Sequence, residues 1–345
     1  MLPITHVTLI RRRVICLFFS LTLCTPTRKA GELGLHTMWK VISGIFLGWT
    51  LGSNDAANIF GTGVAAKIIR YRTAIMLTSV FVILGALAEG EKCFSTVGGL
   101  SHLTPQSAFC AALAAGIVMF VLTYVALPSS TSQAIIGAIL GAGLVSGTPD
   151  LSVLLKITVC WVLTPVGGIV FSFALYHLVG FFIARYFISP QKRSFVIFWG
   201  LVLAGCLGAY ALGSNNVANV TGVYVGTGLL TPFEGLLIGS LSIAGGAMTY
   251  SRKVMMTVGR KITALDEYSA LIAQLSGAIT VEIFTQVGVP VSSSQAIVGG
   301  VAGVGLVKGA KTVSTRTLLE IAIGWVSTPI SAGIISYFLI EFIRF

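Results

Sequence analysis

The side chains best suited to bind an ion are grouped in two short segments. Residues 52–63 carry one carboxylate, Asp55, among amides and glycines, and residues 213–222 repeat the amides with no carboxylate. Carboxylate and amide oxygens can coordinate Na+, and a carboxylate can instead bind a proton. We therefore predict that six residues form a coupling-ion site: Asn54, Asp55, Asn58, Asn215, Asn216 and Asn219.

Two further segments, 128–135 and 290–297, are rich in hydroxyl groups and contain no lysine or arginine. At the beginning of a helix, such side chains join free backbone N–H groups and the positive end of the helix dipole, which together attract anions. This combination suits a tetrahedral oxyanion as the substrate. The predicted substrate-binding residues are Ser129, Ser130, Thr131, Ser132, Gln133, Ser292, Ser293, Ser294 and Gln295.

Both pairs of segments belong to an internal duplication. Gly52, which opens the first amide segment, corresponds to Gly213, and Pro128, which opens the first hydroxyl segment, corresponds to Pro290. A third pair of segments, 161–165 and 325–329, is displaced along the chain by nearly the same amount. Three matches at nearly one separation indicate a repeated unit. We predict an N-terminal extension at 1–37, signal-like or a misassigned start, a first repeat at 38–190 and a second, inverted repeat at 191–345.

The composition is that of a membrane protein. Hydrophobic residues make up 55% of the 345 residues and charged residues 10%, against about 25% charged in soluble domains. The net charge of +11 fits basic loops on the cytoplasmic side of a bilayer, so we expect no nucleic-acid partner. The six cysteines show no paired spacing, so we expect no cofactor and no metal beyond Na+ as coupling ion. We expect a multi-pass protein of the cell membrane, the inner membrane in a bacterium.

Two kinds of interruption are predicted in the membrane helices. A helix through an amide segment would leave backbone groups unsatisfied at the glycines, so we predict a discontinuous helix there, with a re-entrant pair of half-helices as the alternative. The apolar run 134–145 covers only about half a bilayer, which predicts a re-entrant hairpin with the hydroxyl segment at its tip. The predicted elements are broken helices at 39–67 and 195–226, plain spans at 73–88 and 233–250, hairpins at 107–145 and 269–307, and long spans at 151–188 and 318–343. The span 151–188 fits one tilted helix kinked at Pro165 or two short ones.

The basic residues indicate that the two repeats have opposite orientations. A basic loop at 67–72 corresponds to a loop without basic residues at 227–233, and the basic segment 252–261 corresponds to a loop at 89–106 that we predict to be solvated outside. Because basic loops face the cytoplasm, each repeat must cross an odd number of times. One broken helix, one plain span and one long span give three crossings. The predicted fold is therefore an all-α polytopic membrane protein with two inverted-topology repeats, broken helices and re-entrant hairpins.

These residues resemble the signatures of the inorganic phosphate transporter (PiT) family. The family's GxND-type and P-[VI]-S-[ST]-[ST] motifs match both halves, and the resemblance covers 38–345. It implies a secondary active symporter that moves inorganic phosphate with Na+ or H+, and it allows a homodimer, which is common in the family. By position, it implies that Asp55, Asn58, Asn216 and Asn219 bind the coupling ion. It also implies that Thr131 and the serines of the hydroxyl segments bind phosphate.

Three departures from the family pattern keep a sulfate permease of the same family as the alternative. The usual second aspartate is Asn216, a frequent glutamate is replaced by Val82 and Ile243, and a frequent histidine by Gln133 and Gln295. Hydrogen phosphate keeps an O–H group that donates to a carboxylate, whereas sulfate has none at neutral pH, so a site built for that bond rejects sulfate. Because Asp55 remains, we expect phosphate.

Two other classes of protein are weighed against a symporter. In a channel-like anion facilitator, Asp55 would be structural, for example as a helix cap, but neutral donors fit an anion carried with a cation better. A membrane enzyme lacks support, because the spans contain no metal-ligand cluster, Ser-His pair or close carboxylate pair. Glu282, whose counterpart in the first repeat is Phe120, is an intramembrane carboxylate that we rank below Asp55.

Overall fold

The computed structural model describes residues 38–65, 67–127, 129–146, 149–261, 265–309 and 315–344, and the predicted extension at 1–37 lies outside them. Residues Lys40–Phe345 form one compact unit. Within the described ranges the chain is helical, with only an isolated bridge between Ser101 and Pro149. The first half contains η1 (Trp39–Val41), α3 (Ile42–Ile59), α4 (Gly61–Ala65), α5 (Tyr71–Glu89), η2 (Gly90–Cys93), α6 (Phe94–Gly98), α7 (Pro105–Tyr124), α8 (Thr131–Ser146) and α9 (Leu151–Tyr186). The second contains α10 (Pro190–Gly226), α11 (Pro232–Tyr250), α12 (Arg252–Lys261), α13 (Glu267–Val287), α14 (Ser293–Lys308) and α15 (Thr315–Arg344).

The chain is a multi-pass membrane protein. In the described part, six helical stretches are long and apolar enough to cross a bilayer. Two of them, α7 and α13, form the first arms of hairpins, and the others cross. The six are Tyr71–Gly98, Pro105–Tyr124, Leu151–Tyr186, Pro190–Gly226, Glu267–Val287 and Leu319–Ile343. The stretch Leu151–Tyr186 is a single helix of 36 residues with Pro165 inside it, which decides between the two predicted arrangements of this span.

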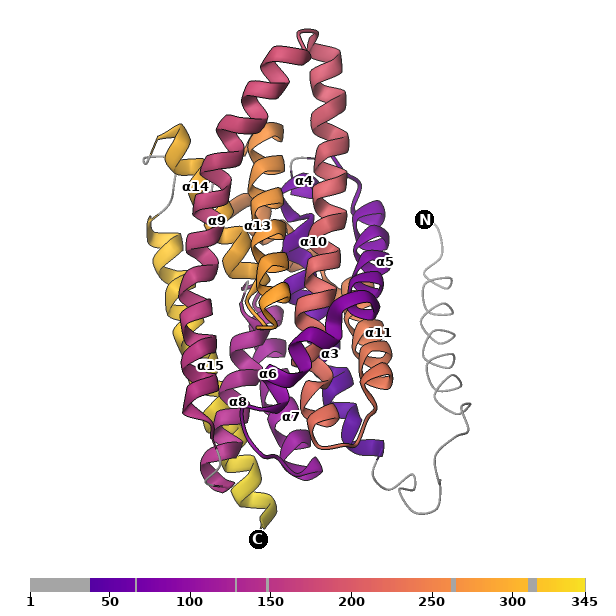
Figure 1. Cartoon of the computed structure of the whole chain (residues 1–345), viewed down its shortest axis with the longest axis vertical. Helices are drawn as coiled ribbons and strands as arrows, with labels where there is room; N and C mark the ends of the chain where they lie inside the picture. The colour runs from indigo at the N-terminus through magenta and orange to yellow at the C-terminus, as the bar shows by residue number, and fades with distance from the viewer. Residues whose placement is uncertain are drawn as a thin grey trace, which may run out of the picture. The chain divides into compact units, whose positions relative to one another are not determined.

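The two repeats run in opposite directions, as predicted (Figure 1). In this view α3 and α9 run upward, whereas their counterparts α10 and α15 run downward. Each repeat has helices at its three predicted crossings, α3, α5 and α9 in the first and α10, α11 and α15 in the second, although α3 and α11 are not among the six apolar stretches. The all-α fold with inverted-topology repeats is therefore confirmed.

Two re-entrant hairpins enter the bundle from opposite ends. Hairpin 1 is α7 with α8, and the bridge between Ser101 and Pro149 joins the segment before α7 to the segment after α8. Hairpin 2 is α13 with α14, and the ion pair between Lys308 and Asp266 joins their outer ends. Because both arms of each hairpin begin and end on one side, the tips lie inside the bundle, where they meet near mid-height in Figure 1.

The second arm of each hairpin packs against the last helix of the other repeat. A Cβ atom on Gly137 of α8 would lie 2.2 Å from the carbonyl oxygen of Pro329 in α15. A Cβ atom on Gly299 of α14 would lie 2.3 Å from the carbonyl oxygen of Pro165 in α9. Backbones this close exclude any side chain, so the glycine-rich arms serve close helix packing, as small residues do in membrane bundles.

The break predicted in the first amide segment lies after its amides, at Phe60, and the break predicted in the second amide segment is wrong. α3 remains helical through 52–58 and ends at Ile59, before Phe60 and the short α4, and α10 is continuous through 213–222. The glycines have a packing role instead, because a Cβ atom on Gly52 would lie 1.8 Å from the carbonyl oxygen of Ile243. The amide side chains find partners in the hairpins, so the helix has no need to unwind.

Breaks that the sequence did not predict lie in the plain spans. α5 passes through the 3-10 turn η2 into α6, and Ser251 separates α11 from α12. These interruptions are related by the repeat, since the separation that aligns Gly52 with Gly213 also aligns Gly90 with Ser251. The predicted solvated loop at 89–106 is therefore wrong in its first part, because residues 90–98 continue the span.

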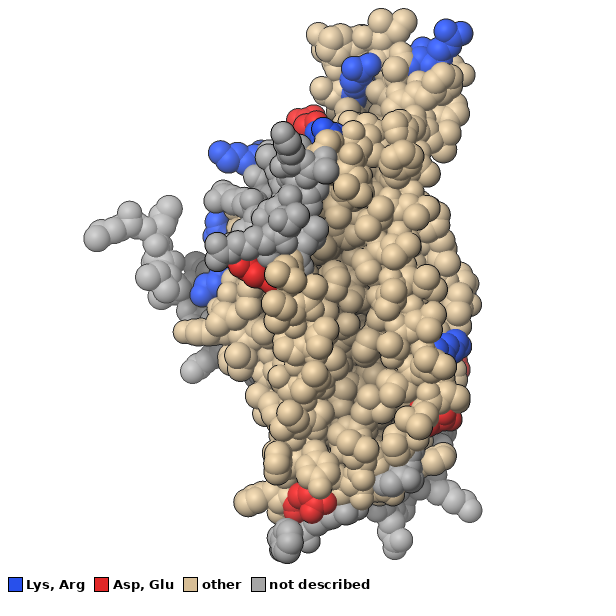
Figure 2. Space-filling view, turned by 90° about the vertical axis from the view of Figure 1, so that its left-hand side faces the viewer, with Lys and Arg blue, Asp and Glu red and all other residues tan. Residues whose placement is uncertain are grey.

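Basic residues gather toward one end of the molecule. Figure 2 shows that most of the lysines and arginines on that face lie in its upper half. The turn between α9 and α10, at the top of Figure 1, is followed by Lys192 and Arg193 in the first turn of α10. This distribution matches the charge asymmetry from which the inverted topology was predicted.

Candidate functional site

The site lies where the tips of the two hairpins meet the amide segments of α3 and α10. The structure brings all fifteen predicted residues to this region, and each is buried, with at most 4% of its surface exposed. Three sets of contacts organise them: two amide clasps, a cage around Asp55 and a repeat-related cage around Asn216. The amide segments come from continuous helices, so their side chains are held in position by rigid elements.

The first asparagine of each amide segment clasps the break in its own hairpin. Asn54 donates from Nδ2 to the Leu127 carbonyl oxygen at 3.0 Å and to Thr123 Oγ1 at 3.0 Å. Its Oδ1 accepts from the Ser129 N–H group at 3.0 Å. These bonds satisfy backbone groups that the interrupted helix leaves without partners, which is a requirement inside a bilayer.

Asn215 makes the same contacts in the second repeat. It donates to the Val289 carbonyl oxygen at 3.0 Å and to Thr285 Oγ1 at 3.1 Å, and it accepts from the Val291 N–H group at 2.7 Å. Asn54 and Asn215, predicted as coupling-ion residues, therefore have all their amide groups engaged in holding the tips. The two threonines of the clasps were not predicted from the sequence. The repeat aligns Thr123 with Thr285, and this match could have identified them.

The cage around Asp55 joins the two repeats. Ser294, from the tip of hairpin 2, donates to Asp55 Oδ1 at 3.0 Å and lies 2.9 Å from the Ser129 carbonyl oxygen. Asn58 donates to Ser294 Oγ at 2.5 Å. Thr131, in the first turn of α8, lies beside the same carboxylate. A carboxylate, a carbonyl oxygen and hydroxyl groups thus converge on one point.

The cage around Asn216 repeats this arrangement without the carboxylate. Ser132, from the tip of hairpin 1, donates to Asn216 Oδ1 at 3.0 Å and lies 2.8 Å from the Val291 carbonyl oxygen. Asn219 donates to Ser132 Oγ at 2.8 Å, and Asn216 donates to Ser293 Oγ at 3.1 Å. The serine and asparagine donors occupy equivalent places in the two cages, but only the Asp55 cage contains a carboxylate.

Each cage contains an amide oxygen that has no partner among the described residues. Asn58 Oδ1 and Asn219 Oδ1 are both buried and accept no hydrogen bond within the described part of the chain. The side-chain oxygens of Gln133 and Gln295 are in the same situation. A buried acceptor without a donor is costly. A cation or water molecule that uses these oxygens would remove the cost, so the residues fit the coordination of a small cation.

Two further predicted residues act as helix caps. Ser130 Oγ accepts from the Gln133 N–H group at 3.3 Å, and Ser292 Oγ accepts from the Gln295 N–H group at 3.2 Å. They cap the first turns of α8 and α14, whose first residues, Thr131 and Ser293, belong to the two cages. The first turns of two helices thus offer partial positive charge to an anion without any lysine or arginine.

The site is closed in this structure. Beside it, a cavity of about 10 Å³ is lined by Ser293, Gln274 and apolar residues of α3, α10, α13 and α14. This volume is near the minimum for one water molecule and too small for an oxyanion. Movement of the hairpins or the helices around them is needed to admit substrate.

Comparisons with known proteins agree with this geometry. A model described as the phosphate transporter family matches residues 51–201 and 184–336. A provisionally named phosphate permease of Methanocaldococcus jannaschii is 35% identical over 300 residues, covering 87% of this chain and 95% of that protein. The sulfate permease CysP of Bacillus subtilis is 27% identical over 309 residues, covering 87% of this chain and 86% of that protein.

A solved structure described as a sodium-dependent phosphate transporter shares the fold. It superposes with a TM-score of 0.79 at 24% identity and covers 89% of this chain and 98% of the other. The relatives are transporters or permeases and not enzymes. The family match spans both repeats, including the amide and hydroxyl segments of each, and on this ground the chain belongs to the phosphate transporter family.

Proposed function

We propose that this protein is a secondary active symporter that moves inorganic phosphate across the membrane together with Na+ or H+. The observation that carries the proposal is the pair of repeat-related cages at the hairpin tips, of which one holds the Asp55 carboxylate. Helix N-termini and neutral hydroxyl groups suit the anion, and the carboxylate with the Asn58 oxygen that lacks a partner in the described part of the chain suits the cation. Membership of the phosphate transporter family supports phosphate as the substrate.

The cation is proposed to bind at the Asp55 cage. Its negative charge lowers the energy of a cation in the membrane interior, whereas the neutral Asn216 cage does so only weakly. The predicted roles of Asn58 and Asp55 are thus kept as a coupling-ion proposal. Asn54 and Asn215 are proposed as structural clasps, because their groups are already paired.

Sulfate is the second candidate substrate. Asn216 stands where a second carboxylate would accept the O–H group of hydrogen phosphate, and one relative is a sulfate permease. A site with one carboxylate discriminates less against an anion that lacks this donor. The proposal of phosphate rests on Asp55, which retains one acceptor for it.

Uptake by purified protein in proteoliposomes tests the proposal. Labelled phosphate is offered with excess sulfate, then labelled sulfate with excess phosphate, under Na+ and pH gradients imposed separately. Accumulation of phosphate above equilibrium, driven by one gradient and resistant to sulfate, is the expected result. Accumulation of sulfate that resists phosphate would assign the sulfate function instead. Uptake that only equilibrates the substrate would assign an anion facilitator.

The positive-inside rule orients the proposed transporter. The end of the molecule that carries Lys192 and Arg193, in the first turn of α10, is proposed to face the cytoplasm. Hairpin 2 then enters from the cytoplasmic side and hairpin 1 from the outside. For the assembly we propose a homodimer, as the family resemblance implies, and light scattering of the detergent-solubilised protein should give twice the mass of one chain.

A further inference from the structure

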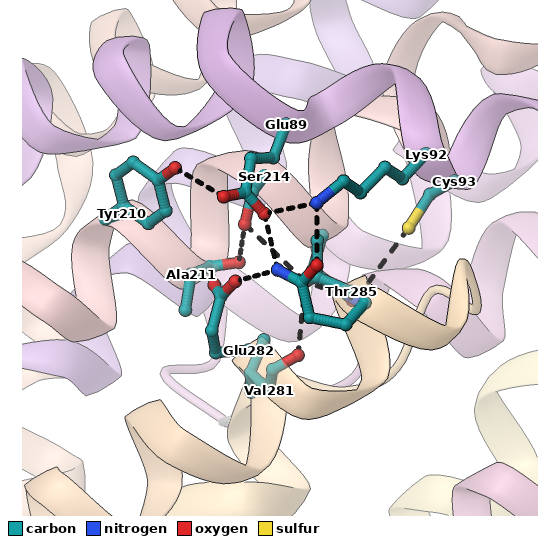
Figure 3. Close-up of polar contacts among 11 residues, drawn as sticks. Glu89, Lys92, Cys93, Tyr210, Ala211, Ser214, Val281, Glu282 and Thr285 are labelled. Carbon is teal, nitrogen blue, oxygen red and sulfur yellow. Dashed lines mark hydrogen bonds and ion pairs between the residues drawn. The ribbon is translucent and has the colours of Figure 1, made fainter.

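A polar cluster joins the break after α5 to the last turn of α13. Lys92 donates to Glu89 Oε2 at 2.9 Å and to Gln286 Oε1 at 2.7 Å, and Gln286 donates from Nε2 to the same Glu89 oxygen at 2.6 Å. Figure 3 shows Glu89, at the end of α5, and Lys92, in η2, pointing toward the side chains of α13. The three residues form a closed ring of hydrogen bonds, which we call the latch.

Two further residues support the latch. Tyr210 of α10 donates to Glu89 Oε1 at 3.0 Å, and Gln286 donates to Glu282 Oε1 at 2.6 Å. The side chain of Lys92 is 43% exposed and that of Glu89 25% exposed. Charged groups with this exposure lie within a membrane span, Tyr71–Gly98, where contact with lipid is costly. The exposed face of the latch therefore requires water.

The latch lies directly behind the amide clasp of hairpin 2. Gln286 follows Thr285, which belongs to the Asn215 clasp, and Cys93 follows Lys92 and lies 3.9 Å from Asn215 Nδ2. The segment after Lys92 also holds the tip itself, because Thr96 donates to the Gly288 carbonyl oxygen at 2.5 Å. Gly288 has a φ of +74°, and a Cβ atom there would lie 2.9 Å from the Lys92 carbonyl oxygen. Displacing η2 and α6 would therefore release the tip of hairpin 2.

The other repeat has different chemistry at the equivalent place. Lys253, the counterpart of Lys92, lies 5.7 Å from the ring centroid of Tyr124 and 5.9 Å from that of Tyr250. Tyr124 corresponds to Gln286, and Tyr250 to Glu89. The ring centroid of Trp49, the counterpart of Tyr210, lies 5.9 Å from that of Tyr250, with the two rings tilted. One side of the protein is thus held by exposed polar hydrogen bonds and the other by a cation on a group of aromatic rings.

These two arrangements differ in how water affects them. Hydrogen bonds between exposed polar groups exchange for bonds to water at small net cost, about 1 kcal/mol each. Separating packed aromatic rings exposes apolar surface and also loses ring contacts and the cation–π attraction. The polar side is therefore the easier of the two to open.

We propose that Lys92, acting through Glu89 and Gln286, is a positioning residue that holds the tip of hairpin 2 closed, and that release of this latch opens the site to water on the side to which α6 leads. The proposal rests on the proposed function in one respect: the region uncovered is the proposed transport site. α6 leads to the end at which α7 begins, because the backbone N–H group of Asp150, after hairpin 1, donates to the Leu100 carbonyl oxygen just after α6. By the orientation proposed above, the latch is the outer gate and the aromatic group the inner one.

Cys93 provides the measurement, because it is buried and adjoins both Lys92 and Asn215. A membrane-impermeant thiol reagent is applied to the full chain in right-side-out proteoliposomes, without substrate or gradient. Cys93 is kept as the only cysteine, and the others are changed to alanine or serine: Cys16, Cys24, Cys110, Cys160 and Cys206. Lys92→Met removes two hydrogen bonds and should raise the labelling rate about tenfold or more.

Three matched variants separate a latch from general loosening. Lys92→Arg keeps the charge and should label as slowly as the unchanged chain. Lys253→Met removes the equivalent lysine in the other repeat and should leave Cys93 labelling unchanged. Gln286→Tyr gives Lys92 a tyrosine partner like Tyr124, which lies beside Lys253 in the other repeat. This variant should also be labelled slowly. Gln286→Leu serves as a second latch-breaking variant if Lys92→Met fails to fold.

The outcomes are distinct from those of the uptake test. Equal labelling of the unchanged chain and of the latch-breaking variants overturns the proposal, whether or not the protein transports phosphate. If Lys253→Met raises the labelling rate of Cys93 as much as Lys92→Met does, the proposal is also overturned. The faster labelling would then come from a general loss of packing. Fast labelling that is confined to the latch variants supports it even in a protein that carries sulfate. A latch variant that transports should also show a changed maximal rate at an unchanged KM for phosphate, since it contacts no substrate.

Discussion

Ser294 donates a hydrogen bond to Asp55 at 3.0 Å, and these two residues belong to opposite repeats. Ser132 and Asn216 repeat the relationship at 3.0 Å with the repeats exchanged. Each hairpin tip therefore completes the cage of the other half. The backbone of each hairpin lines one cage, and its serine closes the other cage. Movement of one hairpin therefore changes both cages at once.

Asp55→Asn should abolish accumulation of substrate against its gradient, because both cages are then neutral and neither holds a cation. The folded protein should remain, since asparagine already occupies the equivalent position 216. Uptake with and without an imposed Na+ or pH gradient checks this. Unchanged accumulation would remove Asp55 from the coupling mechanism.

Asn216→Asp should add a second cation to the transport cycle. The Asn216 cage already has the hydroxyl groups of its counterpart and the Asn219 oxygen that lacks a partner among the described residues, so it needs only the charge. The Hill coefficient for cation activation should rise from about one toward two. A coefficient that stays the same would show that the charge alone does not make a cation site.

Ser294→Ala and Ser132→Ala should have different effects despite their equivalent positions. Loss of Ser294 leaves the Asp55 carboxylate without its donor and should weaken cation activation more than anion affinity. Loss of Ser132 affects the neutral cage and should mainly raise the KM for the anion. Cation and anion titrations of uptake check both variants, and equal losses in the two titrations would contradict the division between the cages.

Asn54→Ala should destabilise the protein by about 2–4 kcal/mol, because the part-buried Leu127 carbonyl oxygen and the buried Ser129 N–H group lose their partners. Thermal unfolding in detergent measures the change. Thr123→Val is the matched control, since it removes only one contact of the same clasp and should cost about 1 kcal/mol. Similar losses in the two variants would mean that Asn54 does not hold the hairpin break.

Gly246→Ala and Gly245→Ala form a test of close packing in adjacent positions. A Cβ atom at Gly246 would lie 2.0 Å from the Trp49 carbonyl oxygen, whereas nothing in the described part of the chain lies within 4 Å of one at Gly245. The first substitution should cost about 1–3 kcal/mol through overpacking, and the second should gain about 0.5–1 kcal/mol from helix propensity. The difference in melting temperature between the two variants measures the contact between Gly246 and Trp49. Equal melting temperatures would contradict the packing of α3 on α11.

Asp266, outside the membrane span, should make the stability of hairpin 2 depend on pH. Partial burial raises the pKa of Asp266, but hydrogen bonds from Lys308 and from the Ser269 N–H group together lower it by more. The net result is a pKa below its usual value. A depressed pKa means that the stabilisation is present above about pH 4 and is lost as the pH falls through the folded-state pKa. The melting-temperature difference between the unchanged chain and Asp266→Asn should therefore shrink in acid. A constant difference would show that the carboxylate charge is not involved.

The duplication made most of the fold predictable from the sequence. The short apolar runs after the hydroxyl segments predicted re-entrant hairpins, and the alternation of basic loops predicted three crossings and inversion. The positions of breaks could not be predicted in the same way. A glycine such as Gly52 has the same appearance in a sequence whether it interrupts a helix or lets another backbone approach it, and here it does the second.

The site was predicted as a set of residues but not as an arrangement. Nothing in a one-dimensional repeat shows that Ser294 faces Asp55 and not Asn216, because that pairing depends on how the two hairpins cross. The division between clasp and cage was hidden for the same reason, since Asn54 and Asp55 are neighbours in the sequence. Lys92 was placed in a loop because its polar surroundings resemble one.

The contacts of Gly137 with Pro329 and of Gly299 with Pro165 constrain how such a protein originates. A polypeptide with one repeat lacks the helix against which the second arm of its own hairpin packs. A protein of one repeat length would complete these contacts only by inserting into the membrane in both orientations and associating as an antiparallel pair. The same reasoning applies today: the two halves, produced as separate polypeptides, should each be degraded alone and accumulate only when made together.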